Sequence, residues 1–412
     1  MASFNHLIFH FKKYGSTHKK LYLLSLILFF WALFDGILSY TTPLVFVSKG
    51  LNNTMMGFVM ASSSVAGALF DFALSRLMKN THFRRLYLIM FSLCFVYPLL
   101  LWKAQAFWLF LVIMAVWGLY YDLENFGLFD FVSRHTQKEE HSSSFGVVSV
   151  FKSLGYLIAP IFAGFLIGQV IDWQPFFLAW FFLVVSFVFF LILYLKIKKN
   201  DHHNHDENVR FKPVKVVAEI KLWKRVAVFI WPVLSFTILL NIADAFFWTI
   251  GPIFSEKLAN LHPLGGLFLS LYMLPSLIVG WFVGPITRKF GKKKTAFVSF
   301  FGGSLFLIFL GMCRHPALIL MLTLLFSFLY SLAWPSIKGS YADYISETPP
   351  LEKEVEALED FSTNIGYVIG PITAGILADR FNSGLAFSIL GLVGIIWVIF
   401  LLKITPKEIN LK

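Results

Sequence analysis

The sequence predicts an all-α integral membrane protein with twelve transmembrane helices in two pseudo-symmetric six-helix bundles. Three observations support this prediction: an apolar composition, a regular series of long apolar runs, and an internal repeat. Of the 412 residues, 58% are apolar and only 14% are charged, whereas soluble domains are about half apolar and a quarter charged. Twelve spans of about 20 residues need roughly 240 apolar positions, which is close to the whole apolar content of the chain.

Twelve apolar runs are each long enough to cross a hydrocarbon core of about 30 Å as a helix, which satisfies its own backbone there. They cover residues 21–47, 54–78, 86–104, 107–131, 144–169, 175–197, 226–254, 265–287, 295–313, 316–341, 356–379 and 383–404. The chain is thus divided into an N-terminal segment (1–20), a first bundle (21–197), a linker (198–225), a second bundle (226–404) and a tail (405–412).

Basic residues are concentrated in alternate loops. Lys and Arg number about 29 on the side that holds both termini and the linker, against five in the loops of the other side. Loops rich in Lys and Arg stay on the cytoplasmic side of a membrane. We therefore expect a multi-pass protein of the cell (inner or plasma) membrane with cytoplasmic termini. This placement accounts for the net charge of +12, so the expected partner is the lipid bilayer and not nucleic acid, and the expected state is a monomer.

The two halves of the sequence repeat each other. Asp35 aligns with Asp244 at an offset of 209 residues, and Asp130 aligns with Asp343 slightly out of that register. The longest match, at an offset of 211, is between LGYLIAPIFAGFL (154–166) and IGYVIGPITAGIL (365–377). Several segments that agree on nearly one offset indicate a duplicated six-helix unit.

Two parallel six-helix halves joined by a long linker resemble the major facilitator superfamily. The run GPITRKFGKKK (284–294) is similar to the signature loop between the second and third helix of a half. Neither half has the family's aspartate before the basic residue, since Met78 and Thr287 stand there, and Asp71 with Arg76 could substitute for it. The resemblance implies two halves that rock around a site near the bilayer midplane, which gives alternating access.

A small-residue pattern on the fifth span resembles the motif of drug and metabolite antiporters. It consists of Gly146, Gly155, Pro160 and Gly164, with an echo in the second half at Gly366, Gly370, Pro371 and Gly375. Small residues let helices approach closely, and a proline bends a span. Generic helix packing would give the same pattern. The resemblance favours export over import.

Ionisable residues inside the spans are candidates for coupling or substrate binding, because each costs about 2.5–3.5 kcal/mol on insertion scales. They are Asp35, Asp244, Asp122, Glu124, Lys152 and Lys338, with Asp35 the first choice for coupling. Asp35 and Asp244 could bind protons or another cation, or they could be hydrogen-bonded acids that only fix the helix interface. Lys152 is expected to pair with Glu124 or Asp122, and Lys338 with Asp360, either as static pairs or as gates. The candidate gating residues are Asp71, Arg76, Arg288 and Asp360.

Aromatic residues could line the path of an amphiphilic solute, although packing or anchoring at the membrane interface is the more common role for each of them. The candidates are Tyr40, Tyr120, Tyr121, Trp248, Tyr272 and Trp334. No nucleotide-binding loop or hydrolase motif is present, and no cofactor or metal is expected. The sequence therefore predicts a secondary active transporter, with proton-coupled export of an amphiphilic or drug-like small solute as the first hypothesis. The alternatives are a proton-coupled importer of a sugar, peptide or organic acid, and, in another class, a membrane sensor or membrane enzyme.

Overall fold

The computed structural model describes residues 19–77, 82–136, 141–167, 171–198, 216–347 and 351–405, and all its regular elements in these ranges are helices. The first half contains α2 (Lys19–Ser48), α3 (Asn53–Leu77), α4 (Phe83–Lys103), α5 (Phe107–His135), α6 (His141–Leu166) and α7 (Gln174–Lys198). The second half contains α8 (Val216–Thr249), α9 (Gly251–Ala259), the short turn η3 (Gly265–Leu267), α10 (Phe268–Phe290), α11 (Lys292–Met312), α12 (Pro316–Glu347), α13 (Glu352–Arg380) and α14 (Ser383–Ile404).

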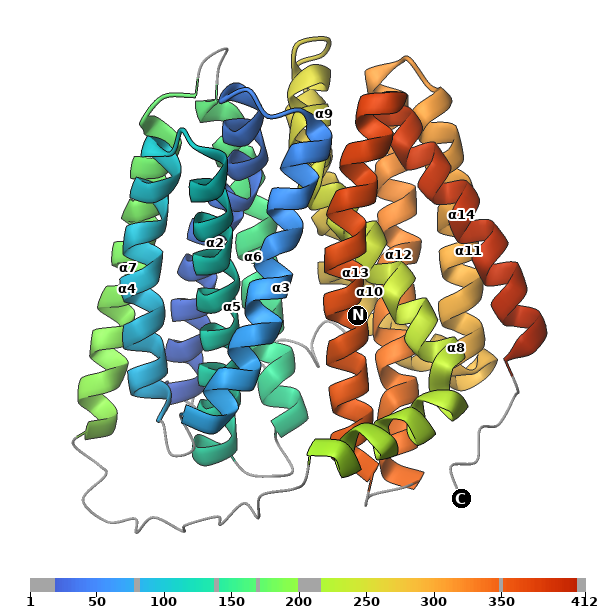
Figure 1. Ribbon diagram of the computed structural model, residues 1–412, viewed down its shortest axis with the longest axis horizontal. Helices are drawn as coiled ribbons and strands as arrows, with labels where there is room; N and C mark the ends of the chain where they lie inside the picture. The colour runs from blue at the N-terminus through green and yellow to red at the C-terminus, as the bar shows by residue number, and fades with distance from the viewer. Residues whose placement is uncertain are drawn as a thin grey trace, which may run out of the picture.

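The two sets of helices form two groups that stand side by side (Figure 1). Helices α2 and α8 begin, and α7 and α14 end, at the lower end of Figure 1, which we call the proximal end. The opposite end, where α9 lies, is the distal end. The terminal segments and most of the predicted linker, including the polar run 201–208, lie outside the described residues, so the predicted domain boundaries stay predictions.

The all-α membrane fold is confirmed. Among the described residues, ten helices are long and apolar enough to cross a membrane, or eleven if the bent α10 counts as one span. Helix α3 is not among them, yet it runs the length of the first bundle (Figure 1). With α3, the architecture accommodates the twelve predicted helices. The predicted run 226–254 is interrupted, because α8 ends at Thr249 and Pro252 cannot supply the N–H that would continue the helical ladder.

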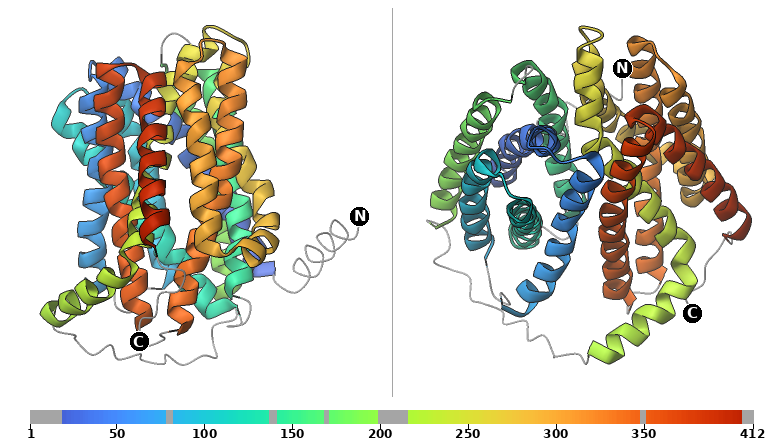
Figure 2. Two further views of the ribbon diagram at one scale, coloured as in Figure 1. Left: turned by 90° about the vertical axis from the view of Figure 1, so that its right-hand side faces the viewer. Right: turned by 45° about the horizontal axis from the view of Figure 1, so that its top comes forward.

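Two pairs of long helices make most of the contact between the bundles: α3 lies along α13, and α6 lies along α10. Helices α3 and α13 meet at their distal ends and separate towards their proximal ends (Figures 1 and 2). A Cβ atom on Gly57 would lie 2.2 Å from the carbonyl oxygen of Pro371, and one on Gly375 would lie 2.1 Å from that of Asn53. The distal junction between the bundles is therefore a backbone-to-backbone contact, which only glycine permits at these positions.

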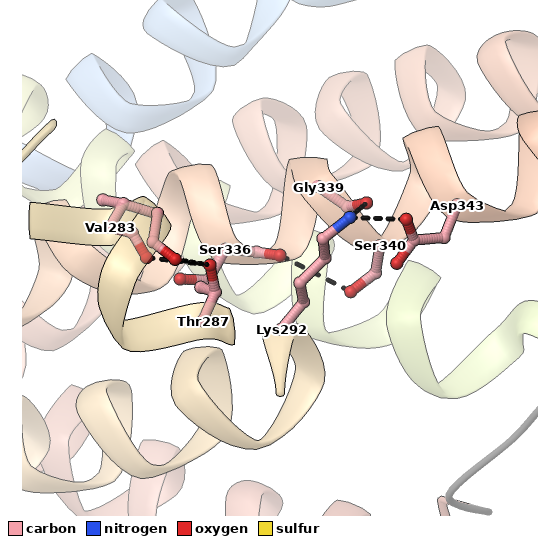
Figure 3. Close-up of polar contacts among 8 residues, drawn as sticks. Val283, Thr287, Lys292, Ser336, Gly339, Ser340 and Asp343 are labelled. Atoms are coloured by element: carbon pink, nitrogen blue, oxygen red, sulfur yellow. Dashed lines mark hydrogen bonds and ion pairs between the residues drawn. The ribbon is translucent and has the colours of Figure 1, made fainter. Parts of the chain in front are cut away.

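The repeated acids Asp130 and Asp343 hold the starts of equivalent helices at the proximal end. Asp130 accepts a hydrogen bond of 2.7 Å from the backbone N–H of Phe83, the first residue of α4. Asp343 lies 2.5 Å from the Nζ atom of Lys292, the first residue of α11, which also donates to the carbonyl of Gly339 at 3.1 Å (Figure 3). In both halves a carboxylate thus bonds to the first residue of the third helix, through the backbone N–H in the first half and through the lysine side chain in the second.

Replacing the acid at this position should cost stability without touching the interior of the bundle. We expect Asp130→Ala to lower the free energy of unfolding by about 1 kcal/mol, as for the loss of a helix cap. Denaturant unfolding of the purified protein measures the effect. Asp172→Ala is the matched control and should change little, because it removes an exposed acid that accepts a hydrogen bond from its neighbour Trp173 and from no other residue that the structure describes.

Candidate functional site

The first site is built around Asp35, in the middle of α2. Its side chain is 1% exposed. The hydroxyl of Tyr120 on α5 donates to Oδ1 at 2.6 Å, and the hydroxyl of Tyr156 on α6 donates to Oδ2 at 2.8 Å. Ser39, one turn along α2, approaches Oδ2 at 3.4 Å, and Tyr121 shares a hydrogen bond of 2.8 Å with Tyr156. Three helices of the first bundle therefore converge on one carboxylate through a chain of hydroxyl groups.

The second site repeats this arrangement around Asp244 on α8. Tyr272 on α10 and Tyr367 on α13 donate to its two oxygens, each at 2.5 Å. Tyr367 is the repeat mate of Tyr156, so each bundle uses the same tyrosine of its fifth helix to hold the aspartate of its first helix. The second tyrosine differs, because Tyr120 comes from the fourth helix of its bundle whereas Tyr272 comes from the second.

The two sites meet at the interface between the bundles. The ring of Tyr156 lies edge-on to that of Trp248 on α8, with centroids 6.0 Å apart. Tyr156, whose hydroxyl donates to Asp35, therefore also contacts the second bundle, and any movement between the bundles would change this contact.

A buried ion pair lies beside the first site. The Nζ atom of Lys152 on α6 is 2.6 Å from Oε2 of Glu124 on α5, and the Glu124 side chain is fully buried. The same Nζ lies 5.2 Å from the ring centroid of Trp31, close enough for a cation–π attraction. Asp122, the other predicted partner, instead lies against α3, where a Cβ atom on Gly67 would come within 2.8 Å of its Oδ2.

The second bundle carries an ion pair of swapped order, with the base on its fourth helix. Lys338 on α12 lies 2.9 Å from Glu359 on α13, and 53% of the lysine side chain is exposed. The sequence predicted Asp360 as the partner. Asp360 lies one residue further along the helix, which turns its side chain by about 100°, so it is exposed and makes no direct ion pair with Lys338, although the charge of that lysine still acts on it. The Nζ of Lys338 also lies 5.7 Å from the ring of Trp334, which places Trp334 by the ion pair.

The predicted gating residues are placed in part. The side chains of Asp71 and Arg76 lie outside the described residues, and Arg288 is exposed in the last turn of α10. The predicted loop 284–294 makes its ion pair through Lys292 instead.

In the small-residue pattern, Gly155 lies against Ala32 and Phe29 of α2. Gly366 and Gly370 lie against α8, and a Cβ atom on Gly164 would be in ordinary van der Waals contact with Tyr40 and Gly266. Gly146 has open space around it, and Pro160 and Pro371 lie inside their helices.

Tyr40 does not join the aspartate sites. It is fully buried, and its hydroxyl donates to Oε1 of Glu256 at 2.7 Å. Glu256 belongs to α9 of the second bundle, beyond the apolar span that ends at Thr249. This hydrogen bond therefore joins the two bundles at the distal end. Sequence reasoning missed Glu256, because an acid in a polar loop region carries no signal of its own.

The Tyr40–Glu256 contact should depend on pH. Burial raises the pKa of Glu256 above its usual value, although the hydrogen bond from Tyr40 acts in the opposite direction. A raised pKa means that the joined state binds the proton more tightly, so the contact is strongest at low pH and weakens as the pH rises through the raised value. Because the thiolate is the form that reacts, the labelling rate of a cysteine placed at the distal end is divided by the rate of a free thiol at each pH. We expect this corrected rate to rise with the pH on that side, and Glu256→Gln to remove the rise. An unchanged pH profile in Glu256→Gln would contradict the assignment.

No group of three or more potential metal ligands was found among the described residues. The polar side chains of the site are carboxyl, hydroxyl and amino groups that bond to one another. Such a set can exchange protons and form hydrogen bonds with a solute, and it is divided between two bundles. The fold and the site together define a class: helical membrane transporters with paired bundles and a polar centre.

The chain belongs to the major facilitator superfamily, whose family model matches residues 24–354. Solved structures with the same fold include the nucleoside transporter NupG (TM-score 0.74, 13% identity, 94% of this chain and 100% of that chain covered). They also include the peptide transporter POT in complex with sulfate (0.72, 14%, 94% and 94%). A third is a bacterial homolog of the human lysosomal transporter Spinster, inward-facing and unoccupied (0.65, 12%, 93% and 94%).

A search of curated proteins gave no match. At these identities the solved structures show the fold alone. The family consists of transporters, so the chain is a multi-pass membrane transporter and not an enzyme.

Proposed function

We propose that this protein is a secondary active transporter that couples solute movement to protons by alternating access, with Asp35 as the principal coupling group and Asp244 as its counterpart. The observation that carries the proposal is the duplicated site: in each bundle an aspartate in the membrane interior is held by two tyrosine hydroxyls. A charged side chain at this depth raises the free energy of insertion into the membrane, so the ionisable residues that are kept there usually have a functional role. Proton binding neutralises such a group.

Coupling to bundle movement would act through Tyr156. A proton on Oδ2 of Asp35 competes with the hydroxyl of Tyr156, which donates to that same oxygen. Tyr156 must then turn its hydroxyl to another acceptor, and its neighbour Tyr121 is within reach. Because the ring of Tyr156 lies against Trp248 of the second bundle, the change in protonation is transmitted to the contact between the bundles.

The solute is proposed to lie where the two aspartate sites meet. Tyr121, Tyr156 and Trp248 supply aromatic faces there, which supports an amphiphilic or drug-like solute, and the small-residue pattern of α6 supports export. The second candidate is proton-coupled uptake of a sugar, peptide or organic acid. The number of hydroxyl and carboxyl groups at the site favours this alternative, since such groups recognise polar solutes.

The orientation and the assembly state are part of the proposal. The imbalance of Lys and Arg supports cytoplasmic termini, so the proximal end would face the cytoplasm and the distal end the outside. Each bundle contributes one aspartate site within a single chain, which supports a monomer as the working unit.

The test uses purified protein in proteoliposomes with an imposed pH gradient. A panel of cationic drugs, nucleosides, peptides, sugars and organic acids is screened for solute-dependent proton movement, read with a dye trapped in the lumen. We expect at least one solute class to move protons, and the direction of that movement separates exchange from co-transport. Solute movement that responds to sodium and ignores the proton gradient would disprove proton coupling, and the absence of any flux across the panel would count against the solute classes.

A further inference from the structure

The carboxylate of Asp379, in the second bundle, lies against the first turn of α3 in the first bundle. Asp379 lies in the last turn of α13, and its Oδ1 accepts from the backbone N–H and the side-chain amide of Asn53, at 3.1 and 2.7 Å. Its Oδ2 accepts from the backbone N–H and the hydroxyl of Thr54, at 2.7 and 2.6 Å. Four hydrogen bonds therefore connect one exposed carboxylate to the distal start of α3.

The position of Asp379 is unfavourable within its own helix. The C-terminal end of a helix carries a partial negative charge, so an acid in the last turn is repelled by it. The N-terminal end of α3 carries the opposite charge and unpaired N–H groups. Asp379 is therefore stabilised only while α3 of the other bundle lies against it.

Helix α3 needs the other bundle to complete its cap. The side-chain oxygen of Asn52 accepts a hydrogen bond from the N–H of Met55 at 2.8 Å, and its backbone carbonyl accepts one from the N–H of Met56 at 2.9 Å. The backbone N–H groups of Asn53 and Thr54 donate hydrogen bonds to Asp379. Of the first four N–H groups of α3, two thus donate to Asn52, directly before the helix, and two donate to Asp379, which is more than 320 positions away in the chain.

The contact lies at the glycine junction described above, since Gly375 of α13 meets the backbone of Asn53 itself. In the sequence repeat Asp379 corresponds, at the offset of 211, to Gly168, which has no side chain that could make an equivalent bond. The device therefore belongs to one of the two helix pairs that join the bundles.

We propose that Asp379 and the start of α3 form a latch that holds the bundles together at the distal end and that must break each time the transporter opens there. Asp379 is a positioning residue, because it acts through α3 and touches no solute. The proposal rests on the alternating-access mechanism proposed above. It does not depend on the coupling ion or the solute, so the two can fail separately.

The test measures the separation of the distal ends directly. Spin labels are attached to Lys49→Cys in the α2–α3 loop and Leu261→Cys in the α9–α10 loop, both exposed positions, after Cys94→Ala and Cys313→Ala. Pulsed dipolar spectroscopy in nanodiscs, without added solute, gives the populations of the short and long distances. We expect Asp379→Asn to raise the ratio of long to short distances about tenfold, which corresponds to about 1.4 kcal/mol.

Two further variants decide between a latch and a merely structural cap. Asp172→Asn should leave the distances unchanged, because Asp172 is an exposed distal acid whose one hydrogen bond within the described part of the chain is to its neighbour Trp173. Thr54→Val keeps the volume and removes one donor of the four, so it should shift the ratio in the same direction by a smaller factor, about threefold. It also serves if Asp379→Asn does not fold. Unchanged distances in Asp379→Asn or, failing that, in Thr54→Val would overturn the proposal, even if thermal stability fell.

Discussion

Asp35→Asn should abolish solute accumulation driven by a pH gradient, with a fall of at least about a hundredfold, as expected when a proton-transfer group is lost. The substitution keeps the shape of the side chain and leaves one acceptor oxygen for Tyr120 or Tyr156, while the other tyrosine can accept from the amide NH2 group. The amide does not take up and release a proton. Exchange of labelled for unlabelled solute, which needs no net proton movement, should continue. Proteoliposome uptake with and without the gradient measures both.

The control for this prediction removes a hydrogen bond and keeps the carboxyl group. Ser39→Ala deletes the weakest donor to Asp35, at 3.4 Å, and should change pH-driven transport less than threefold. Asp244→Asn is compared in the same assay, because the second site has the same construction. If the Asp35→Asn variant still accumulates solute when a pH gradient is imposed and the Asp244→Asn variant does not, Asp244 is the coupling group and Asp35 is not.

Lys152→Met should destabilise the fold by about 3–5 kcal/mol, because it leaves the carboxylate of Glu124 buried without its cation. Glu124 is fully buried, and its other oxygen, Oε1, has no hydrogen-bond partner among the described residues. Methionine has nearly the shape of the lysine stem, so the effect reports charge more than volume. Unfolding in mild detergent, followed by the fluorescence of the native tryptophans, provides the measurement.

The second ion pair is the matched control. Lys338→Met breaks a pair of which the lysine is 53% exposed, and such pairs contribute about 0–1 kcal/mol. The double variant Lys152→Met with Glu124→Gln should recover most of the stability lost by Lys152→Met alone. Equal losses from Lys152→Met and Lys338→Met, or no recovery in the double variant, would show that the pair near Asp35 is not buried in the working protein.

Much of the fold could be predicted because the membrane imposes it. A helix that crosses lipid must be long and apolar, and this leaves a strong signal in the sequence. The repeat was equally informative: it aligned Asp35 with Asp244 and Asp130 with Asp343, and in each pair the structure shows the same local role. The break at Ile250 was missed, since apolar residues continue on both sides of it.

The site was only partly predictable, because the missing information concerns which way a side chain turns. Tyr156 and Tyr367 lie in the aligned segments, but their neighbours suggested helix packing, and nothing local showed that their hydroxyls reach an aspartate on another helix. The partner of Lys338 was displaced by one residue for the same reason. Glu256 and Asp379 stand among ordinary polar residues near helix ends, so their roles are visible only when both bundles are in place.

The glycines at the distal junction have a consequence for kinetics. Where Gly57 and Gly375 meet the opposite backbone, the glycines themselves insert no side chain into the other helix. At these two points the helices can part without moving a glycine side chain out of its packing. The activation barrier for separation is then set by a few polar bonds at the rim, so single substitutions there can alter how fast the transporter cycles without reshaping its interior.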